Sequence, residues 1–191
     1  MTRMILASAS PRRSELLAQI GIQPEIVPSG IEETVTQTEP AGIVLELSGL
    51  KCRDVAGKTA GEAVVIGADT IVTLDGEILG KPADSEDAVR MLRELQGRSH
   101  AVFTGVTLAL VRDGQILREE SFAEKTEVHV AAMTEAEIRA YADSGEPLDK
   151  AGAYGIQGSF ARYITGIDGD YSNVVGLPLC RLWHCLQDMM R

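Results

Sequence analysis

A short apolar run from Val64 to Val72 constrains the fold of this chain more than any other stretch. Its β-branched residues predict a buried strand. The run also contains Asp69, and burying an ionised carboxylate is costly unless another group pairs with it. Asp69 is therefore a candidate functional residue. The alternative is an ordinary surface carboxylate at the end of the strand.

The sequence Asp75-Gly76 follows this strand and is a common two-residue hairpin turn. Pairing across the turn places Leu74 opposite Glu77. Counting back along both arms, Thr70 faces Lys81. The predicted hairpin thus brings a basic side chain to the strand that carries the candidate carboxylate.

Size and charge limit the classes of function. With 191 residues, we expect a single domain over residues 1–191, with room for two lobes. The net charge of −10 argues against general nucleic-acid or anionic-membrane binding. The apolar runs are too short to cross a bilayer, and no signal peptide is expected. Cys52, Cys180 and Cys185 lack zinc-ligand spacing, which favours buried thiols and a cytoplasmic protein.

The N-terminal segment breaks a local rule. Met4–Ala7 is a predicted strand, and Ser10 suits the N-cap of the helix that follows. Arg12 and Arg13 then place two cations in the first turn, where the helix dipole favours anions. Free backbone N–H groups, two guanidinium groups and the hydroxyls of Ser8 and Ser10 would together bind an anion such as phosphate. Two solvated surface arginines are the alternative.

Two further charged residues are weaker candidates. Glu33 lies in a polar, threonine-rich loop, where carboxylates are usually solvated. Opposite a triphosphate it could instead ligate a hard divalent cation. Lys51 lies beside the apolar stripe of a helix predicted over residues 41–56, where a lone lysine normally extends its stem to reach water.

The remaining elements follow from apolar spacing and from turn and capping residues. His100 is expected to be a structural histidine rather than a ligand. Trp183, Leu186 and Met190 are expected on the core face of the last helix. The pattern predicts helices over residues 85–96, 135–144 and 179–190, and strands over 102–111, 116–122 and 160–167.

A glycine-rich segment, residues 145–158, interrupts this pattern. Its four glycines suggest close approach of the backbone to a ligand, and loops on a rigid scaffold often carry sites. Gln157 offers both a hydrogen-bond donor and an acceptor, as the reading of a nucleobase edge requires.

Five segments carry a further pattern, and they run almost from end to end of the chain: Ser8–Arg13, Gly67–Thr70, Gly80–Pro82, Asp149–Gly158 and Asn173–Leu179. Together, and in this order, they resemble the Maf family of nucleoside triphosphate pyrophosphatases. The Gly-Ala-Tyr-Gly-Ile-Gln-Gly form is similar to the branch that acts on dTTP and UTP, whereas a sister branch prefers 7-methyl-GTP.

The resemblance implies an α/β fold with a mixed twisted sheet flanked by helices and two lobes around a central cleft, as in Maf and ITPase-like proteins. It implies a homodimer and a nucleoside triphosphate substrate, with no nucleic acid or membrane partner. The expected reaction converts dTTP, UTP and modified pyrimidine nucleotides to monophosphate and pyrophosphate, with Mg²⁺ or Mn²⁺ as cofactor. The alternatives are a 7-methyl-GTP pyrophosphatase and a nucleotide-binding regulator of cell division.

The resemblance also implies roles for single residues. Ser8, Arg12, Arg13 and Lys51 would hold the phosphates, with Lys81 facing them. Glu33 and Asp69 would belong to the metal centre, and Asp69 would be the general base. Arg12, Thr70 and Gln157 occupy positions associated with substrate choice.

Overall fold

The structure is a computed structural model that describes residues 2–191. Its strands form one mixed sheet in the order β2-β1-β3-β5-β6-β7, and β4 pairs with β3 outside this path. β1 runs parallel to β2 and β3, whereas β4 and β7 run antiparallel to their partners. The strands are β1 (Arg3–Leu6), β2 (Glu25–Ile26), β3 (Glu62–Leu74), β4 (Glu77–Leu79), β5 (Ser99–Arg112), β6 (Gln115–Val130) and β7 (Ile164–Asp168).

Helices flank this sheet, so the predicted α/β class is confirmed. Three short 3₁₀ helices, η1 (Glu146–Asp149), η2 (Ala151–Ala153) and η3 (Ser159–Tyr163), lie in and after the glycine-rich segment. The α-helices are α1 (Pro11–Gln19), α2 (Pro40–Ala56), α3 (Ser85–Leu95), α4 (Glu135–Ala142), α5 (Tyr171–Val175) and α6 (Leu179–Met189). No helix among residues 2–191 has the length and apolar character needed to cross a membrane.

The chain divides into two compact units. The first comprises residues 2–69, 104–124 and 176–191, and the second comprises residues 70–103 and 125–175. Three of the boundaries between them fall within the long strands β3, β5 and β6, and the fourth follows α5. A single domain over residues 1–191 and a central cleft both stay predictions.

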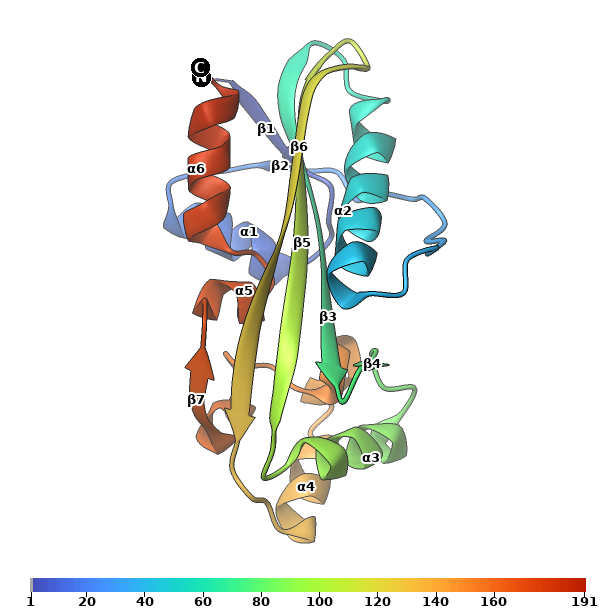
Figure 1. Cartoon of the computed structure of the whole chain (residues 1–191), viewed down its shortest axis with the longest axis vertical. Coiled ribbons are helices and arrows are strands. Elements are labelled where there is room, and N and C mark those ends of the chain that lie inside the picture. The colour runs from blue at the N-terminus through green and yellow to red at the C-terminus, as the bar shows by residue number, and fades with distance from the viewer. Residues whose placement is uncertain (1) are drawn as a thin grey trace. The chain divides into compact units, whose positions relative to one another are not determined.

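In the first unit, α2 packs tightly on β3 and β5. A side chain at Gly67 would place its Cβ 2.3 Å from the Ser48 carbonyl oxygen, and one at Gly105 would lie 2.2 Å from that of Val44. Only glycine permits so close an approach of a helix backbone to a strand. Figure 1 shows α2 on one side of the strands of this unit and α1 and α6 on the other. The core beneath α2 contains Ile5, Ala7, Cys52, Val55, Ala56, Ala63, Val65, Ala109 and Val111.

In the second unit, the predicted hairpin forms. Leu74 pairs with Glu77 in the expected register, but the ladder ends at Val72 and Leu79. The predicted pairing of Thr70 with Lys81 is therefore wrong, because β4 stops before Lys81. Figure 1 shows α3 and α4 beside one another in this unit, and ion pairs from Arg93 to Glu135 and from Arg139 to Glu86 join these two helices.

Two further predictions about local structure are correct only in part. The run at 160–167 forms the 3₁₀ helix η3 before the strand β7 begins at Ile164. On α6, the buried residues are Leu182, Leu186 and Met189, whereas Trp183 is 42% exposed and Met190 44%.

The cysteines also depart in part from expectation. Only Cys52 is fully buried, Cys185 is half-buried, and Cys180 is exposed.

Candidate active site

The hydroxyl of Ser8, just after β1, is held in place by two hydrogen bonds. The chain leaves β1 beside β3, with the amide of Ala7 donating to the carbonyl of Ile66 at 2.8 Å. Ser8 follows and is buried, and its Oγ accepts from the Ser10 amide at 3.2 Å and from Arg13 Nη1 at 2.9 Å. Ser10 occupies the N-cap position of α1 as predicted, but its side chain makes no capping hydrogen bond.

Arg13 is held at both ends of its guanidinium group. Besides the contact with Ser8, Nε donates to the carbonyl of Gly176 at 2.9 Å. Loss of water around the guanidinium lowers the pKa of Arg13, and the negative charge of Asp69 acts in the opposite direction, as that of Glu33 does. Arg12, the other cation of this turn, also lowers it. The first turn of α1 holds no acidic residue, so this corner is cationic, as an anion site requires.

Lys51 joins two carboxylates in the same unit. Its Nζ donates to Asp69 Oδ1 at 2.5 Å and lies 2.9 Å from Glu33 Oε1. The side chains of Lys51 and Asp69 are only 15% and 14% exposed, whereas that of Glu33 is 50% exposed. Asp69 is thus an internal, paired residue of β3, and Lys51 ends in ion pairs rather than in open solvent.

The packing of α2 on β3 explains this contact. Gly67 lies against Ser48 and Cys52 of α2, so the two backbones are as close as they can be. Lys51 precedes Cys52 on the helix, and Asp69 follows Gly67 by two residues on the strand. In a strand, residues two apart point to the same face. Asp69 therefore faces α2, where Lys51 reaches it.

The loop of Glu33 is tied to α2 on both sides of that residue. On one side, Asp54 accepts from Ser29 Oγ at 2.8 Å and from the Gly30 amide at 3.2 Å. On the other, Glu46 accepts from the amide and hydroxyl of Thr36, each at 2.8 Å. The hydrogen bond from the Thr36 amide is the largest cause of a lowered pKa at Glu46. These two tethers hold Glu33 at Lys51.

The pair Glu33 and Asp69 fits a hard divalent cation. Both carboxylates already converge on one positive group, Lys51 Nζ, and Mg²⁺ commonly takes one or two carboxylates together with substrate phosphate oxygens. Among residues 2–191, no three His, Cys, Asp or Glu side chains gather in a way that could hold a metal ion.

Six of the nine positions predicted for the site belong to the first unit: Ser8, Arg12, Arg13, Glu33, Lys51 and Asp69. Thr70, Lys81 and Gln157 belong to the second unit. There, the Gly152 amide donates to the Gly80 carbonyl at 3.1 Å, which joins the segment before Lys81 to the glycine-rich segment of Gln157. A single site that includes all these residues stays a prediction.

Sequence reasoning missed the residues that hold this site in place. Gly67 carried a usable signal, because a glycine inside a strand often marks a close backbone approach. Glu46 and Asp54 carried no such signal in the sequence. Each is one of many acidic residues, and its hydrogen-bond partners lie in an irregular loop.

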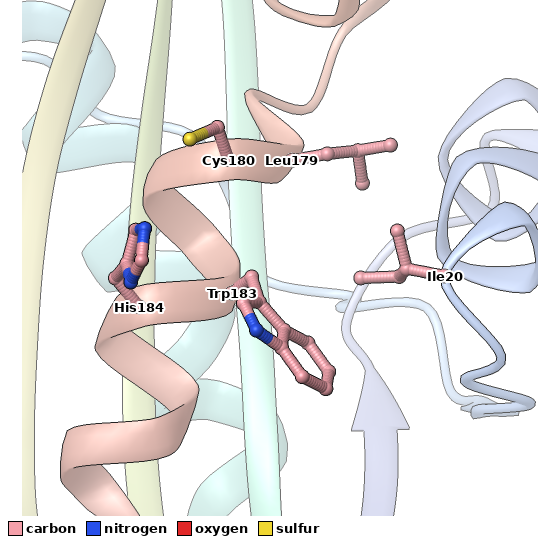
Figure 2. A pocket seen from close by; sticks show the side chains of 5 residues that line it. All are labelled: Ile20, Leu179, Cys180, Trp183 and His184. Atoms are coloured by element: carbon pink, nitrogen blue, oxygen red, sulfur yellow. The ribbon is translucent and has the colours of Figure 1, made fainter.

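A separate hollow lies between α6 and the end of α1 in the first unit. It has a volume of about 410 Å³ and is lined by Ile20, Leu179, Cys180, Trp183 and His184. Figure 2 shows Leu179 and Trp183 directed toward Ile20, with Cys180 and His184 on the other side of α6. None of these residues belongs to the site described above.

Comparison with known proteins gives the family. A dTTP/UTP pyrophosphatase of Agathobacter rectalis is 48% identical over 99% of this chain and 98% of that protein, and one of Symbiobacterium thermophilum is 52% identical over 95% and 91%. A HAM1 protein structure from Coxiella burnetii aligns over 70% of this chain and 75% of that one, with a TM-score of 0.48 and 16% identity. The family model described as Maf-like protein matches residues 3–189, and the chain therefore belongs to the Maf-like family.

Proposed function

We propose that this protein is a nucleoside triphosphate pyrophosphatase that hydrolyses dTTP and UTP between the α- and β-phosphates, giving the monophosphate and pyrophosphate. The names of the relatives above support the substrates. The convergence of Glu33 and Asp69 on Lys51, together with the hydrogen bond from Arg13 to Ser8, is the observation that carries the chemistry.

In the proposed mechanism, Arg12 and Arg13 in the first turn of α1 bind the phosphates. Arg13 donates hydrogen bonds from a guanidinium fixed by Ser8 and Gly176, so it needs little rearrangement when the substrate enters. Arg12 and Lys51 add positive charge. Fixed donors of this kind stabilise the charge that develops on the leaving pyrophosphate.

Asp69 would orient the attacking water and accept its proton. One of its oxygens is engaged by Lys51, and the other can accept a hydrogen bond from water. The low exposure of the Lys51–Asp69 pair limits competing water and fixes the carboxylate in direction. General-base catalysis requires this kind of positioning within hydrogen-bond reach of the water.

Glu33 and Asp69 would hold Mg²⁺ or Mn²⁺ together with oxygens of the substrate. The ion, when bound, would neutralise charge on the triphosphate. Lys51 would then exchange part of its contact with these carboxylates for contact with a phosphate.

The proposal includes a homodimer in the cytoplasm. The three cysteines lie in the described part of the chain and are free thiols, in keeping with a reducing compartment. Light scattering of the purified protein would give twice the mass of 20.5 kDa for the dimer.

A substrate panel tests the function. Pyrophosphate release is measured from dTTP, UTP, CTP, GTP and 7-methyl-GTP, with Mg²⁺, with Mn²⁺ and with EDTA. Metal-dependent release that is strongest with dTTP and UTP is expected. Preference for 7-methyl-GTP would keep the chemistry and change the substrate class. No release from any of them would favour a nucleotide-binding regulator of cell division instead.

A further inference from the structure

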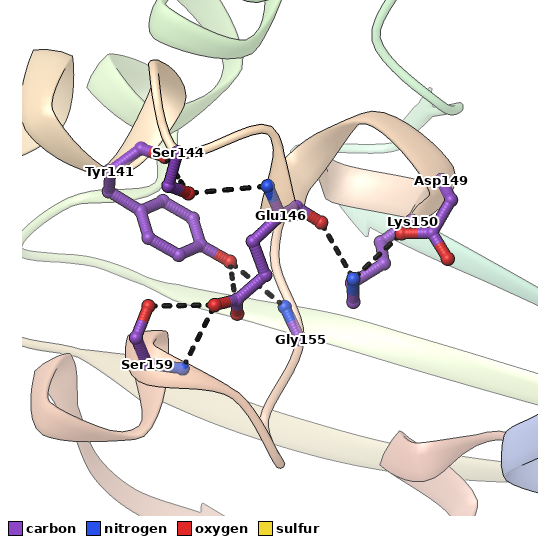
Figure 3. Close-up of polar contacts among 7 residues, drawn as sticks. All are labelled: Tyr141, Ser144, Glu146, Asp149, Lys150, Gly155 and Ser159. Atoms are coloured by element: carbon purple, nitrogen blue, oxygen red, sulfur yellow. Dashed lines mark hydrogen bonds and ion pairs between the residues drawn. The ribbon is translucent and has the colours of Figure 1, made fainter.

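One carboxylate in the second unit holds together two ends of the glycine-rich segment. Glu146 lies at the start of η1, and its Oε2 accepts from both the amide and the hydroxyl of Ser159, at 3.1 and 2.7 Å. Figure 3 shows these contacts converging on the Glu146 carboxylate. Residues 13 positions apart in the sequence are thereby fixed to one side chain.

Tyr141 extends this contact to the middle of the segment. Its hydroxyl donates to Glu146 Oε1 at 3.0 Å and accepts from the Gly155 amide at 3.3 Å. The ring also packs against Phe160, with the ring centroids 5.0 Å apart. Figure 3 shows Glu146, Tyr141, Gly155 and Ser159 as one connected network.

Lys150 makes further hydrogen bonds within the same segment. Its Nζ donates to the backbone carbonyl of Glu146 at 2.6 Å and to Asp149 Oδ1 at 2.7 Å. The Lys150 side chain is only 17% exposed, so its ammonium group is directed into the glycine-rich segment rather than into solvent.

Two glycines of the segment are explained by these side chains. A Cβ at Gly158 would lie 2.0 Å from Glu146 Oε1, and one at Gly155 would lie 2.6 Å from Lys150 Cε. The space that a side chain would need is thus filled by the network itself. Close approach of a ligand, the expectation from the sequence, is not needed to account for either glycine.

Gln157 lies between these two glycines. Its side chain is exposed, while the preceding Ile156 is buried. The backbone is therefore fixed on both sides of Gln157, by the Gly155 amide before it and by the Ser159 amide after it. Fixing the ends of a short exposed stretch removes conformational freedom that binding would otherwise have to remove.

We infer that Glu146 is a positioning residue for substrate choice: its carboxylate, through Tyr141 and Ser159, holds Gln157 in the orientation that selects the pyrimidine base. This inference rests on the proposed function. Glu146 does not touch the substrate in this scheme and acts only through the segment that presents Gln157.

The electrostatics agree with a permanently charged anchor. Burial raises the pKa of Glu146, but the hydrogen bonds from Ser159 and Tyr141 outweigh it and the net pKa is lowered. A carboxylate that stays ionised accepts from three donors at once, which a neutral amide cannot do.

The test combines Glu146→Ala with Gln157→Ala in a double-mutant cycle. The measured quantity is the ratio of kcat/KM for dTTP to that for GTP. Glu146→Ala is expected to lower this ratio about tenfold, mainly through a higher KM for dTTP, the effect of losing about 1.4 kcal/mol of selective binding. In the Gln157→Ala background the same substitution should change the ratio little, because coupled residues are not additive.

Two further variants distinguish a specific effect on substrate choice from a general loss of folding. Tyr141→Phe keeps the ring on Phe160 and removes only the hydroxyl, and it should lower the ratio in the same direction. Glu127→Ala is the matched control, since that exposed carboxylate pairs only with Lys125 among the ion pairs of β6 and should leave the ratio unchanged. Hydrogen exchange at the Gly155 and Ser159 amides should accelerate in Glu146→Ala and not in the control.

The outcomes separate the two proposals. An active wild-type enzyme whose dTTP preference survives both Glu146→Ala and Tyr141→Phe would overturn the inference and leave the function intact. Equal losses for dTTP and GTP would do the same, because they indicate a general structural role. A wild-type protein that releases no pyrophosphate from any nucleotide would overturn the proposed function itself.

Discussion

Lys51 Nζ on α2 lies 2.5 Å from Asp69 Oδ1 on β3, and the two residues are 18 positions apart in the sequence. The same ammonium group lies 2.9 Å from Glu33. One cation thus holds a nearly buried carboxylate on one side and a half-exposed one on the other. Lys51 is the structural centre of the proposed site, and its removal would leave two carboxylates facing each other.

Lys51→Met is expected to abolish most activity and to lower stability. Removing one partner of a poorly solvated ion pair leaves an uncompensated charge, at a cost of about 3 kcal/mol. Losing one positive contact to the phosphates should lower kcat by about a hundredfold. Urea unfolding and pyrophosphate release measure the two effects. Lys125→Met, which removes a lysine from an exposed pair, is the control, with a change below about 1 kcal/mol. Full activity in Lys51→Met would remove Lys51 from the site.

Asp69→Asn separates turnover from binding. The amide keeps an oxygen for Lys51 but is a poor base, so pyrophosphate release should fall by about a thousandfold or more. Affinity for a dTTP analogue with a non-hydrolysable α,β-linkage, measured by calorimetry, should change little. Near-normal turnover would show that another group accepts the proton.

Gly67→Ala tests whether the close packing of α2 on β3 sets the site. The added methyl would meet the Ser48 carbonyl oxygen and Cys52, both parts of the helix that carries Lys51. We expect a loss of about 1–3 kcal/mol in the free energy of unfolding, together with a marked fall in activity. Gly57→Ala, at the end of the same helix, meets nothing closer than 3.5 Å and should preserve both. A stable and active Gly67→Ala variant would contradict this explanation of the Lys51–Asp69 contact.

Glu46→Ala tests the tether of the Glu33 loop. Losing the hydrogen bonds to Thr36 frees the loop on one side, so Glu33 should hold a divalent cation less well. The concentration of Mg²⁺ that gives half-maximal activity is expected to rise several-fold, while kcat at saturating metal stays close to that of the wild type. Glu94→Ala, which removes an exposed partner of Arg90, should leave the metal requirement unchanged. An unaltered requirement in Glu46→Ala would mean that the tether does not serve the metal.

Local patterns in the sequence were sufficient to predict the strands β1 and β3, the hairpin turn and the cationic first turn of α1. They were insufficient for Lys51 and Glu33, which looked like ordinary solvated residues until α2 and its loop were placed against β3. That placement depends on Gly67 and on contacts between distant segments, which no local period encodes.

The errors have physical causes as well. The apolar content of residues 160–167 suited a strand, and the strand forms from Ile164 onward. Phe160 instead packs among Tyr141, Tyr154 and Tyr163, within the 3₁₀ helix η3. Trp183 fitted the helical period of α6 only approximately, and the true core face lies one residue earlier, at Leu182.

His100 behaves as the structural histidine expected from the sequence, although it is only partly satisfied. Its Nε2 lies 2.7 Å from the Tyr154 hydroxyl, and Nδ1 is buried with no hydrogen-bond partner among residues 2–191. Burial is the main cause that lowers the pKa of His100 to about 4, and the charge of His129 acts in the same direction.

The folded state therefore keeps His100 neutral at pH values where the unfolded chain takes up a proton. Between about pH 6.5 and pH 4 the unfolded state binds more protons, so stability must fall as the pH falls through this window. His100 alone should make the protein about 2 kcal/mol less stable at pH 5 than at pH 7. Urea unfolding of the wild type and of His100→Asn at both pH values isolates this effect, because the asparagine removes the titration and keeps a polar partner for Tyr154. His184→Asn, at an exposed histidine, is the control, and the difference in its free energy of unfolding between pH 7 and pH 5 should match that of the wild type. An equal pH dependence in His100→Asn and the wild type would show that His100 does not resist protonation in the folded protein.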